Sequence, residues 1–200
     1  MSTPITFYFD FSSPYGYIAS AKIDALAAKH NRDVIWRPFL LGAAFKATGG
    51  GPLPSIPIKG PYHVRDFPRS ARFHGVPYRQ PGTFPISAVQ PARAFYWLDG
   101  RDPQRAKALA AALFRAYFAE GIDISSADAT LAVCAKSGLD ADAVRAGIND
   151  QAVKDRLRAE TEQALGAGAF GSPYIIVDGE PFWGSDRLDQ IERWLATGGF

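Results

Sequence analysis

The sequence predicts an α/β fold in which strands near both ends of the chain enclose a block of helices. Three observations indicate it. The first forty residues follow the order strand, helix, strand; the middle of the chain carries a series of helix start signals; and two short apolar runs return after residue 166. Strands that alternate with helical patterns are typical of parallel β-α-β units, and a run of helices between strands indicates an inserted helical block.

The first unit begins with Ile5–Phe11, a β-branched and aromatic run that predicts a buried strand. Pro14 suits the first position of a helix, with Ser13 before it as the N-cap, and apolar spacing continues this helix to His30. The run Val34–Phe39 predicts a second strand. Because a helix connects the two strands, we expect them to be parallel.

The next stretch, residues 41–83, breaks this pattern. It contains Gly49-Gly50-Gly51 and seven prolines between Pro52 and Pro81, which predict an irregular surface segment with one short helix around Val64–His74. Start signals and apolar spacing then predict a block of helices over Ile86–Leu98, Gln104–Ala119, Ser126–Lys136, Asp140–Gly147 and Gln151–Leu165.

Strand patterns return near the C-terminus. Ser172–Val177 and Glu180–Trp183 predict two strands, and Asp178-Gly179 between them is typical of a hairpin turn. Gly184-Ser185-Asp186 predicts the cap of a closing helix. This order of elements is that of a thioredoxin fold interrupted by an all-α domain. We therefore assign residues 1–45 and 166–200 to a thioredoxin-like domain, and residues 46–165 to an irregular linker and helical insert.

Composition narrows the function. With 22 basic and 20 acidic residues among 200, the net charge of +2 argues against a nucleic-acid partner. No apolar run approaches the roughly 18–20 residues of a membrane span, and Asp10 interrupts the first apolar run, so we expect neither a membrane helix nor a signal peptide. The cytoplasm is the expected compartment.

The cysteine count excludes a whole class of chemistry. A lone Cys134 cannot form an internal disulfide, a dithiol redox pair or a thiolate zinc site. The three histidines lie too far apart in the sequence for a metal-ligand motif, and we predict no metal site.

Three short segments carry the candidate chemistry. Ser13-Pro14-Tyr15-Gly16 stands where thioredoxin-fold oxidoreductases keep Cys-x-x-Cys, although a Ser-Pro pair alone is more often only a helix cap. Ser172-Pro173 precedes a strand where such folds keep a cis-proline, and the backbone there can pair with an extended peptide. Ser185 and Asp186 offer backbone N–H groups and a carboxylate to an amino-acid head. Glutathione, with its thiol, peptide backbone and amino-acid head, would use all three segments.

These motifs also carry a family resemblance. The segments Phe9–Tyr15, Phe170–Pro173 and Gly184–Leu188 closely resemble those of 2-hydroxychromene-2-carboxylate isomerases, which belong with kappa-class glutathione transferases in the DsbA-like branch of thioredoxin folds. The resemblance covers roughly residues 4–45 and 166–196. It implies glutathione as cofactor, a small aromatic-derived substrate and a homodimer.

The resemblance also implies roles for individual residues. The serine that matches Ser13 acts on the glutathione sulfur, residues that match Ser185 and Asp186 hold the γ-glutamyl end, and Ser172, next to Pro173, pairs through its backbone. The segment 57–62 looks like the family's lysine-bearing segment, which implies that Lys59 lies near the glutathione carboxylate.

Two positions depart from the family pattern. A triple glycine stands where kappa-like relatives often have an asparagine before the lysine, and Ser87 stands where many isomerase relatives carry asparagine. The second substrate is therefore not specified. Since it would carry a pyruvate carboxylate, a cation should line its pocket, and the candidates are Lys59, Arg69 and Arg93.

The favoured function is a glutathione-dependent cis-trans isomerase that interconverts 2-hydroxychromene-2-carboxylate and trans-o-hydroxybenzylidenepyruvate by reversible thiolate addition. Without an identifiable base beside it, Ser13 is expected to stabilise the thiolate rather than act as nucleophile. Two alternatives remain: a kappa-type glutathione transferase, which would release a stable conjugate, and a non-catalytic thioredoxin-like module that binds peptide.

Overall fold

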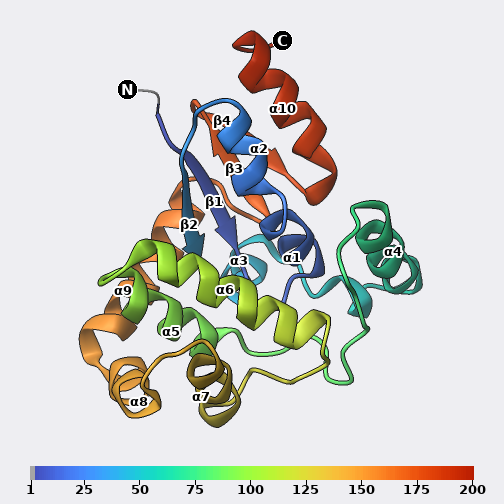
Figure 1. The fold of residues 1–200 in the computed structure, drawn as a ribbon. Helices are drawn as coiled ribbons and strands as arrows, with labels where there is room; N and C mark the ends of the chain where they lie inside the picture. The colour runs from blue at the N-terminus through green and yellow to red at the C-terminus, as the bar shows by residue number, and fades with distance from the viewer. Residues whose placement is uncertain (1–2) are drawn as a thin grey trace.

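A computed structural model describes residues 3–200, so the first two residues of the predicted thioredoxin-like segment lie outside it. Its sheet has four strands: β1 (Ile5–Phe9), β2 (Val34–Pro38), β3 (Tyr174–Val177) and β4 (Glu180–Trp183). Their order is β2-β1-β3-β4 (Figure 1). β1 pairs in parallel with β2, as predicted, and β3 is antiparallel to both of its neighbours. The two ends of the chain thus share one sheet.

Successive side chains of β1 point to opposite faces of the sheet. Phe7 and Phe9 enter the main core, whereas Tyr8 packs in a second cluster with Phe39 and Ala164. On the first side, α1 (Pro14–Ser20), α2 (Ile23–Lys29) and α10 (Leu188–Thr197) lie next to one another (Figure 1). The second cluster is built by α3 (Leu41–Thr48) and α9 (Gln151–Gly166).

The predicted block of helices is present in the middle of the chain. Its members are α5 (Val89–Asp99), α6 (Pro103–Phe118), α7 (Ala127–Lys136), α8 (Ala141–Asn149) and α9. The block shares its core with the sheet, because the ring of Phe9 contacts those of Phe95 and Phe114. Cys134 is buried within this block, and burial raises the pKa of its thiol to about 11, so this thiol is unreactive near neutral pH.

The segment predicted to be irregular contains two α-helices. The prediction of irregular structure is wrong for residues 41–48, and the helix predicted over Val64–His74 is too short. Residues 41–48 form α3, where the Asp10 carboxylate accepts a hydrogen bond from the N–H of Leu41, 2.8 Å away. Because α3 begins at this tertiary contact, the sequence around Leu41 contains no local signal for the start of a helix. The second helix, α4 (Lys59–Phe73), begins five residues before the predicted Val64 and accommodates Pro68 in its interior.

Other boundaries also differ from the prediction: α5 begins at Val89 rather than Ile86, and β3 begins at Tyr174 rather than Ser172. β1 ends at Phe9 rather than at residue 11, because the Asp10 side chain accepts from the N–H of Ser12 and turns the chain. The first predicted helix is divided into α1 and α2. The closing helix begins at Leu188, after a short 3-10 turn, η2 (Ser185–Arg187). Gly184 precedes this turn and Ser185 and Asp186 lie within it, so none of the three caps α10 directly.

Among the described residues, no helix combines the length and the apolar composition that crossing a bilayer requires.

Candidate active site

Ser13 lies in the loop between β1 and α1, and its hydroxyl makes two hydrogen bonds. Its Oγ accepts from the N–H of Gly16 at 3.0 Å, which is the predicted helix cap. The same hydroxyl donates to the carbonyl oxygen of Ser172 at 2.8 Å. The Ser172–Pro173 peptide bond is cis, as expected. The two segments that the sequence pointed to are therefore in direct contact, and the Ser13 side chain is buried between them.

A second hydrogen bond ties the same two segments. Ser172 Oγ accepts from the backbone N–H of Asp10 at 3.0 Å. Gly16 leaves no room for a side chain here, since a Cβ at this position would lie 2.8 Å from Ser172 Oγ. The absence of a side chain at residue 16 thus lets α1 approach the cis-proline loop closely.

Asp10 is a buried carboxylic acid that the sequence reading did not assign to the site. Its Oδ1 accepts from the N–H and the hydroxyl of Ser12, and its Oδ2 accepts from the N–H of Leu41. Burial raises the pKa of Asp10 above its ordinary value, and the hydrogen bonds from Ser12 and Leu41 offset only part of that rise. Asp10 therefore holds together the end of β1, the Ser13 loop and the start of α3.

The turn η2 adjoins the cis-proline loop. The N–H of Gly184 donates to the carbonyl oxygen of Pro173 at 3.1 Å, and the positive φ of Gly184, +109°, suits glycine. Ser185 is buried, whereas the Asp186 side chain is 71% exposed and its carboxylate lies 3.5 Å from Arg187. A soluble ligand can therefore reach the Asp186 carboxylate.

Lys59 is set apart from the other predicted site residues. It is the first residue of α4 and is exposed to solvent. Within the described part of the chain, no hydrogen bond joins it to Ser13, Ser172 or Asp186. Of the other cations proposed for a substrate carboxylate, Arg69 is hydrogen-bonded to Asp66 and Tyr62, whereas the buried Nε of Arg93 has no hydrogen-bond partner among residues 3–200.

Tyr15 brings α4 to the site, and this contact was missed although Tyr15 lies inside the recognised motif. Its hydroxyl donates to Asp66 Oδ2 at 2.5 Å and lies 3.3 Å from His63 Nδ1. Burial, followed by the hydrogen bond to Asp66, raises the pKa of Tyr15 far above its ordinary value, so its hydroxyl stays protonated near neutral pH. Helical periodicity alone could have placed His63 and Asp66 near one face of α4, because they are three residues apart. It could not have shown that this face packs against α1.

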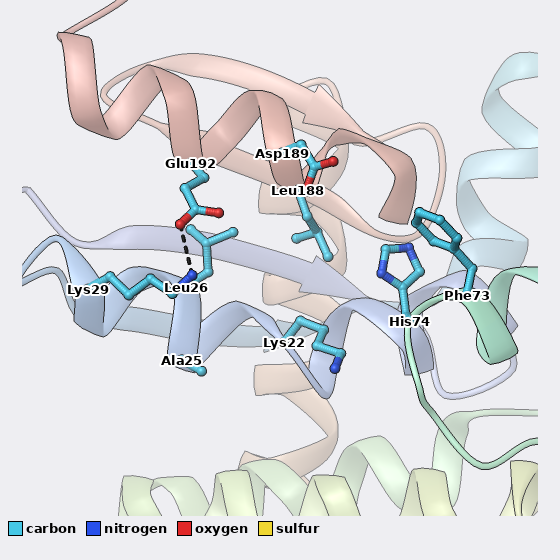
Figure 2. Close-up of a pocket in the computed structure, with 9 residues that line it drawn as sticks. All are labelled: Lys22, Ala25, Leu26, Lys29, Phe73, His74, Leu188, Asp189 and Glu192. Atoms are coloured by element: carbon cyan, nitrogen blue, oxygen red, sulfur yellow. Dashed lines mark hydrogen bonds and ion pairs between the residues drawn. The ribbon is translucent and has the colours of Figure 1, made fainter.

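A separate groove of about 320 Å³ lies between α2, the end of α4 and α10 (Figure 2). Its walls include Lys22, Phe73, His74 and Leu188, and none of the predicted site residues lines it. No cluster of three or more metal-ligating side chains occurs among residues 3–200.

The sheet, the inserted helices and the cis-proline opposite Ser13 define a thioredoxin-fold protein in which a serine occupies the place of the first cysteine. A family model described as a DSBA-like thioredoxin domain matches residues 4–196, and the chain belongs to this family.

Individual proteins of known sequence or structure show which members of the family this chain resembles. It is 32% identical over 201 residues to a 2-hydroxychromene-2-carboxylate isomerase of Sphingobium xenophagum, covering 98% of this chain and 99% of that protein. It is 29% identical to glutathione S-transferase kappa 2 of Caenorhabditis elegans, covering 96% and 91%. A solved structure of a 2-hydroxychromene-2-carboxylate isomerase matches with a TM-score of 0.86 at 27% identity, covering 97% and 95%. The predicted family is confirmed, and these similarities support an enzyme of isomerase or transferase type.

The buried Asp10 gives a prediction for its titration. We expect its carboxyl group to titrate above 3.8, because burial favours the neutral form. The folded protein then holds this proton to higher pH than the unfolded chain does. The contribution of Asp10 to the free energy of unfolding should therefore fall as the pH rises from 3.8 through the folded-state pKa.

Carbon NMR of the side-chain carboxyl groups measures this directly. Asp178 provides an internal reference of opposite sign, because its hydrogen bond to Arg32 lowers its pKa. A midpoint for Asp10 at or below 3.8 would contradict the account of its burial.

Proposed function

We propose that this protein is a glutathione-dependent cis-trans isomerase that interconverts 2-hydroxychromene-2-carboxylate and trans-o-hydroxybenzylidenepyruvate, or close analogues, in aromatic catabolism. The observation that carries the proposal is the buried Ser13 hydroxyl, hydrogen-bonded to the carbonyl oxygen next to a cis-proline. A thioredoxin fold with a hydroxyl at this position has no dithiol of its own, so the thiol must come from a ligand.

Glutathione fits the charges and hydrogen-bonding groups around this hydroxyl. In the proposed complex its γ-glutamyl ammonium faces Asp186, and its γ-glutamyl carboxylate meets the backbone N–H groups near Ser185. Its cysteinyl backbone pairs with Ser172 beside Pro173, and its glycine carboxylate lies toward Lys59. The kappa-class relative supports glutathione as the ligand, because that relative is a glutathione transferase.

The proposed role of Ser13 is to stabilise the glutathione thiolate. A free thiol of this kind has a pKa of about 8.5, so lowering it by one to two units needs about 1.4 to 2.8 kcal/mol. A hydrogen bond to a charged group contributes on the order of 1.5–3 kcal/mol. One hydroxyl is therefore sufficient.

This role requires an exchange of partners, since the Ser13 hydroxyl donates to Ser172 in the present structure. When glutathione binds, the O–H of Ser13 turns to the sulfur, and the Ser172 carbonyl accepts the cysteinyl N–H of the ligand instead. Each group keeps a hydrogen bond throughout, so neither is left unpaired in a buried site.

The proposed reaction is reversible conjugate addition. The thiolate adds to the enone carbon of the ring-opened substrate, the former double bond becomes single and rotates, and the thiolate then leaves. Glutathione is regenerated. Arg93 is the available partner for the substrate carboxylate, because Arg69 is already paired with Asp66 and Lys59 is assigned to the glycine carboxylate of glutathione. The proposal includes a cytoplasmic location, for which the lone cysteine argues. It also includes a homodimer, which rests on the resemblance to the family.

A kappa-type glutathione transferase is the second candidate, favoured by the 29% identity to a protein of that name over 96% of this chain. The binding site for glutathione would be the same in both cases. The two functions differ in whether the thiolate leaves again after addition.

Turnover with limiting glutathione tests the proposed function. With 2-hydroxychromene-2-carboxylate in large molar excess, the ultraviolet spectrum should convert to that of the trans isomer, and mass spectrometry should find free glutathione at its starting level. No conversion should occur without glutathione. A glutathione adduct that accumulates in proportion to the glutathione supplied would favour the transferase, and no reaction in either assay would contradict both.

The pH–rate profile of Ser13→Ala tests the role of the hydroxyl. Losing a hydrogen bond to a charged group should lower the rate about tenfold to hundredfold near neutral pH. Higher pH should recover part of this loss, because solvent then deprotonates the bound thiol. Ser20→Ala is the matched control, since the Ser20 hydroxyl donates to the carbonyl oxygen of Tyr17 within α1 and not toward Ser172.

Two results would overturn the role of Ser13. A Ser13→Ala variant that is inactive at every pH would indicate covalent catalysis by the serine. A variant with full activity at neutral pH would leave Ser13 as a helix cap only.

A further inference from the structure

Helix α4 stands at the side of the molecule, next to α1 (Figure 1). Apart from the short turn that precedes it, α1 is the element with which α4 makes its main contacts. One end of α4 carries Lys59, and α1 begins directly after Ser13. The contact between these two helices therefore determines how far Lys59 lies from Ser13.

The centre of that contact is the hydrogen bond from Tyr15 to Asp66. The donor oxygen lies 2.5 Å from Asp66 Oδ2, and the ring of Tyr15 packs edge-on against Phe67 with ring centroids 5.2 Å apart. Asp66 also accepts hydrogen bonds from Arg69 and Ser70, both on α4. Tyr15 is thus the partner of Asp66 that comes from outside α4.

The ionisation of both groups keeps this bond intact near neutral pH. Burial and the neighbouring Asp66 raise the pKa of Tyr15, so it remains a donor. Burial alone would raise the pKa of Asp66, but the hydrogen bonds from Tyr15, Arg69 and Ser70 outweigh it and lower that pKa, so Asp66 remains a charged acceptor. Charge-assisted hydrogen bonds of this kind are the strong ones.

Lys59 and Asp66 belong to one continuous helix, and the segment that precedes Lys59 packs against its first turn. Lys59 N–H donates to the carbonyl oxygen of Pro57 at 2.8 Å across Ile58, whose φ is +68°. Gly60 fits against Pro54 so closely that a Cβ on it would lie 2.1 Å from the Pro54 carbonyl oxygen. A shift of α4 at Asp66 is therefore transmitted to Lys59, seven residues and about 10 Å along the helix.

We propose that Tyr15 and Asp66 are positioning residues that fix Lys59 relative to Ser13, and so determine how strongly the site recognises the glycine carboxylate of glutathione. This inference rests on the proposed function, because it takes glutathione as the ligand. Neither residue touches the ligand carboxylate. Each acts through the placement of α4.

Binding of two peptides to matched variants tests the inference. Calorimetry compares glutathione with γ-glutamylcysteine, which lacks the glycine and its carboxylate. The wild type should prefer glutathione by about twofold to fivefold, as an ion pair at an exposed site provides. Lys59→Ala should bind both peptides nearly equally. Tyr15→Phe should lose most of the preference while it still binds γ-glutamylcysteine as the wild type does.

Tyr62→Phe is the control, because it removes a tyrosine hydroxyl that contacts Arg69 in the same cluster without joining α4 to α1. Its preference should match that of the wild type. Asp66→Ala removes the same bond from the other side and should reproduce Tyr15→Phe, so the test does not depend on one variant folding. Far-ultraviolet circular dichroism confirms the fold of each.

The outcomes are distinct. A wild-type preference in both Tyr15→Phe and Asp66→Ala would overturn the inference, and so would an equal loss in Tyr62→Phe. A wild type that binds both peptides equally would also overturn it, because Lys59 would then not recognise the glycine carboxylate. A wild type that binds neither peptide would contradict the proposed function as well, and that result is recognisable before any variant is measured.

Discussion

The hydrogen bond from Ser13 to the carbonyl oxygen of Ser172 joins segments that are 159 residues apart in the chain. Around it, a backbone N–H of Asp10 meets the Ser172 hydroxyl, and the missing side chain of Gly16 allows α1 to approach. The four-stranded sheet brings these segments together, since β1 precedes Ser13 and its neighbour β3 follows Ser172. The inserted helices therefore separate the two halves of the site in the sequence but not in the folded protein.

The buried Asp10 stabilises the loop that carries Ser13. A buried carboxyl group is costly unless its oxygens are hydrogen-bonded, and Asp10 receives three such bonds from Ser12 and Leu41. These bonds end β1, shape the Ser13 loop and start α3. In the proposed complex the same arrangement holds the Ser13 hydroxyl where a sulfur can meet it. The exposed Asp186 beside Gly184 remains accessible to the charged end of the ligand.

Much of this architecture could be predicted from the sequence. The apolar runs of β1 and β2, the hairpin at Asp178-Gly179 and the helix caps are local signals, and they indicated a thioredoxin fold with a helical insert. The facing positions of Ser13 and Pro173 followed from that fold. Helix α3 did not, because its start depends on a tertiary hydrogen bond from Leu41 to Asp10. The prolines near α4 favoured an irregular segment, although Pro61 lies in its first turn. The Tyr15–Asp66 contact spans 51 residues and depends on how α4 packs, which no local pattern specifies.

A crystal structure with reduced glutathione bound tests the central claim most directly. The claim is that the Ser13 hydroxyl exchanges the Ser172 carbonyl for the ligand sulfur. The account predicts Ser13 Oγ within hydrogen-bonding distance of the sulfur, with the Ser172 carbonyl accepting the cysteinyl N–H. A complex in which Ser13 Oγ still donates to Ser172, with the sulfur elsewhere, would contradict it.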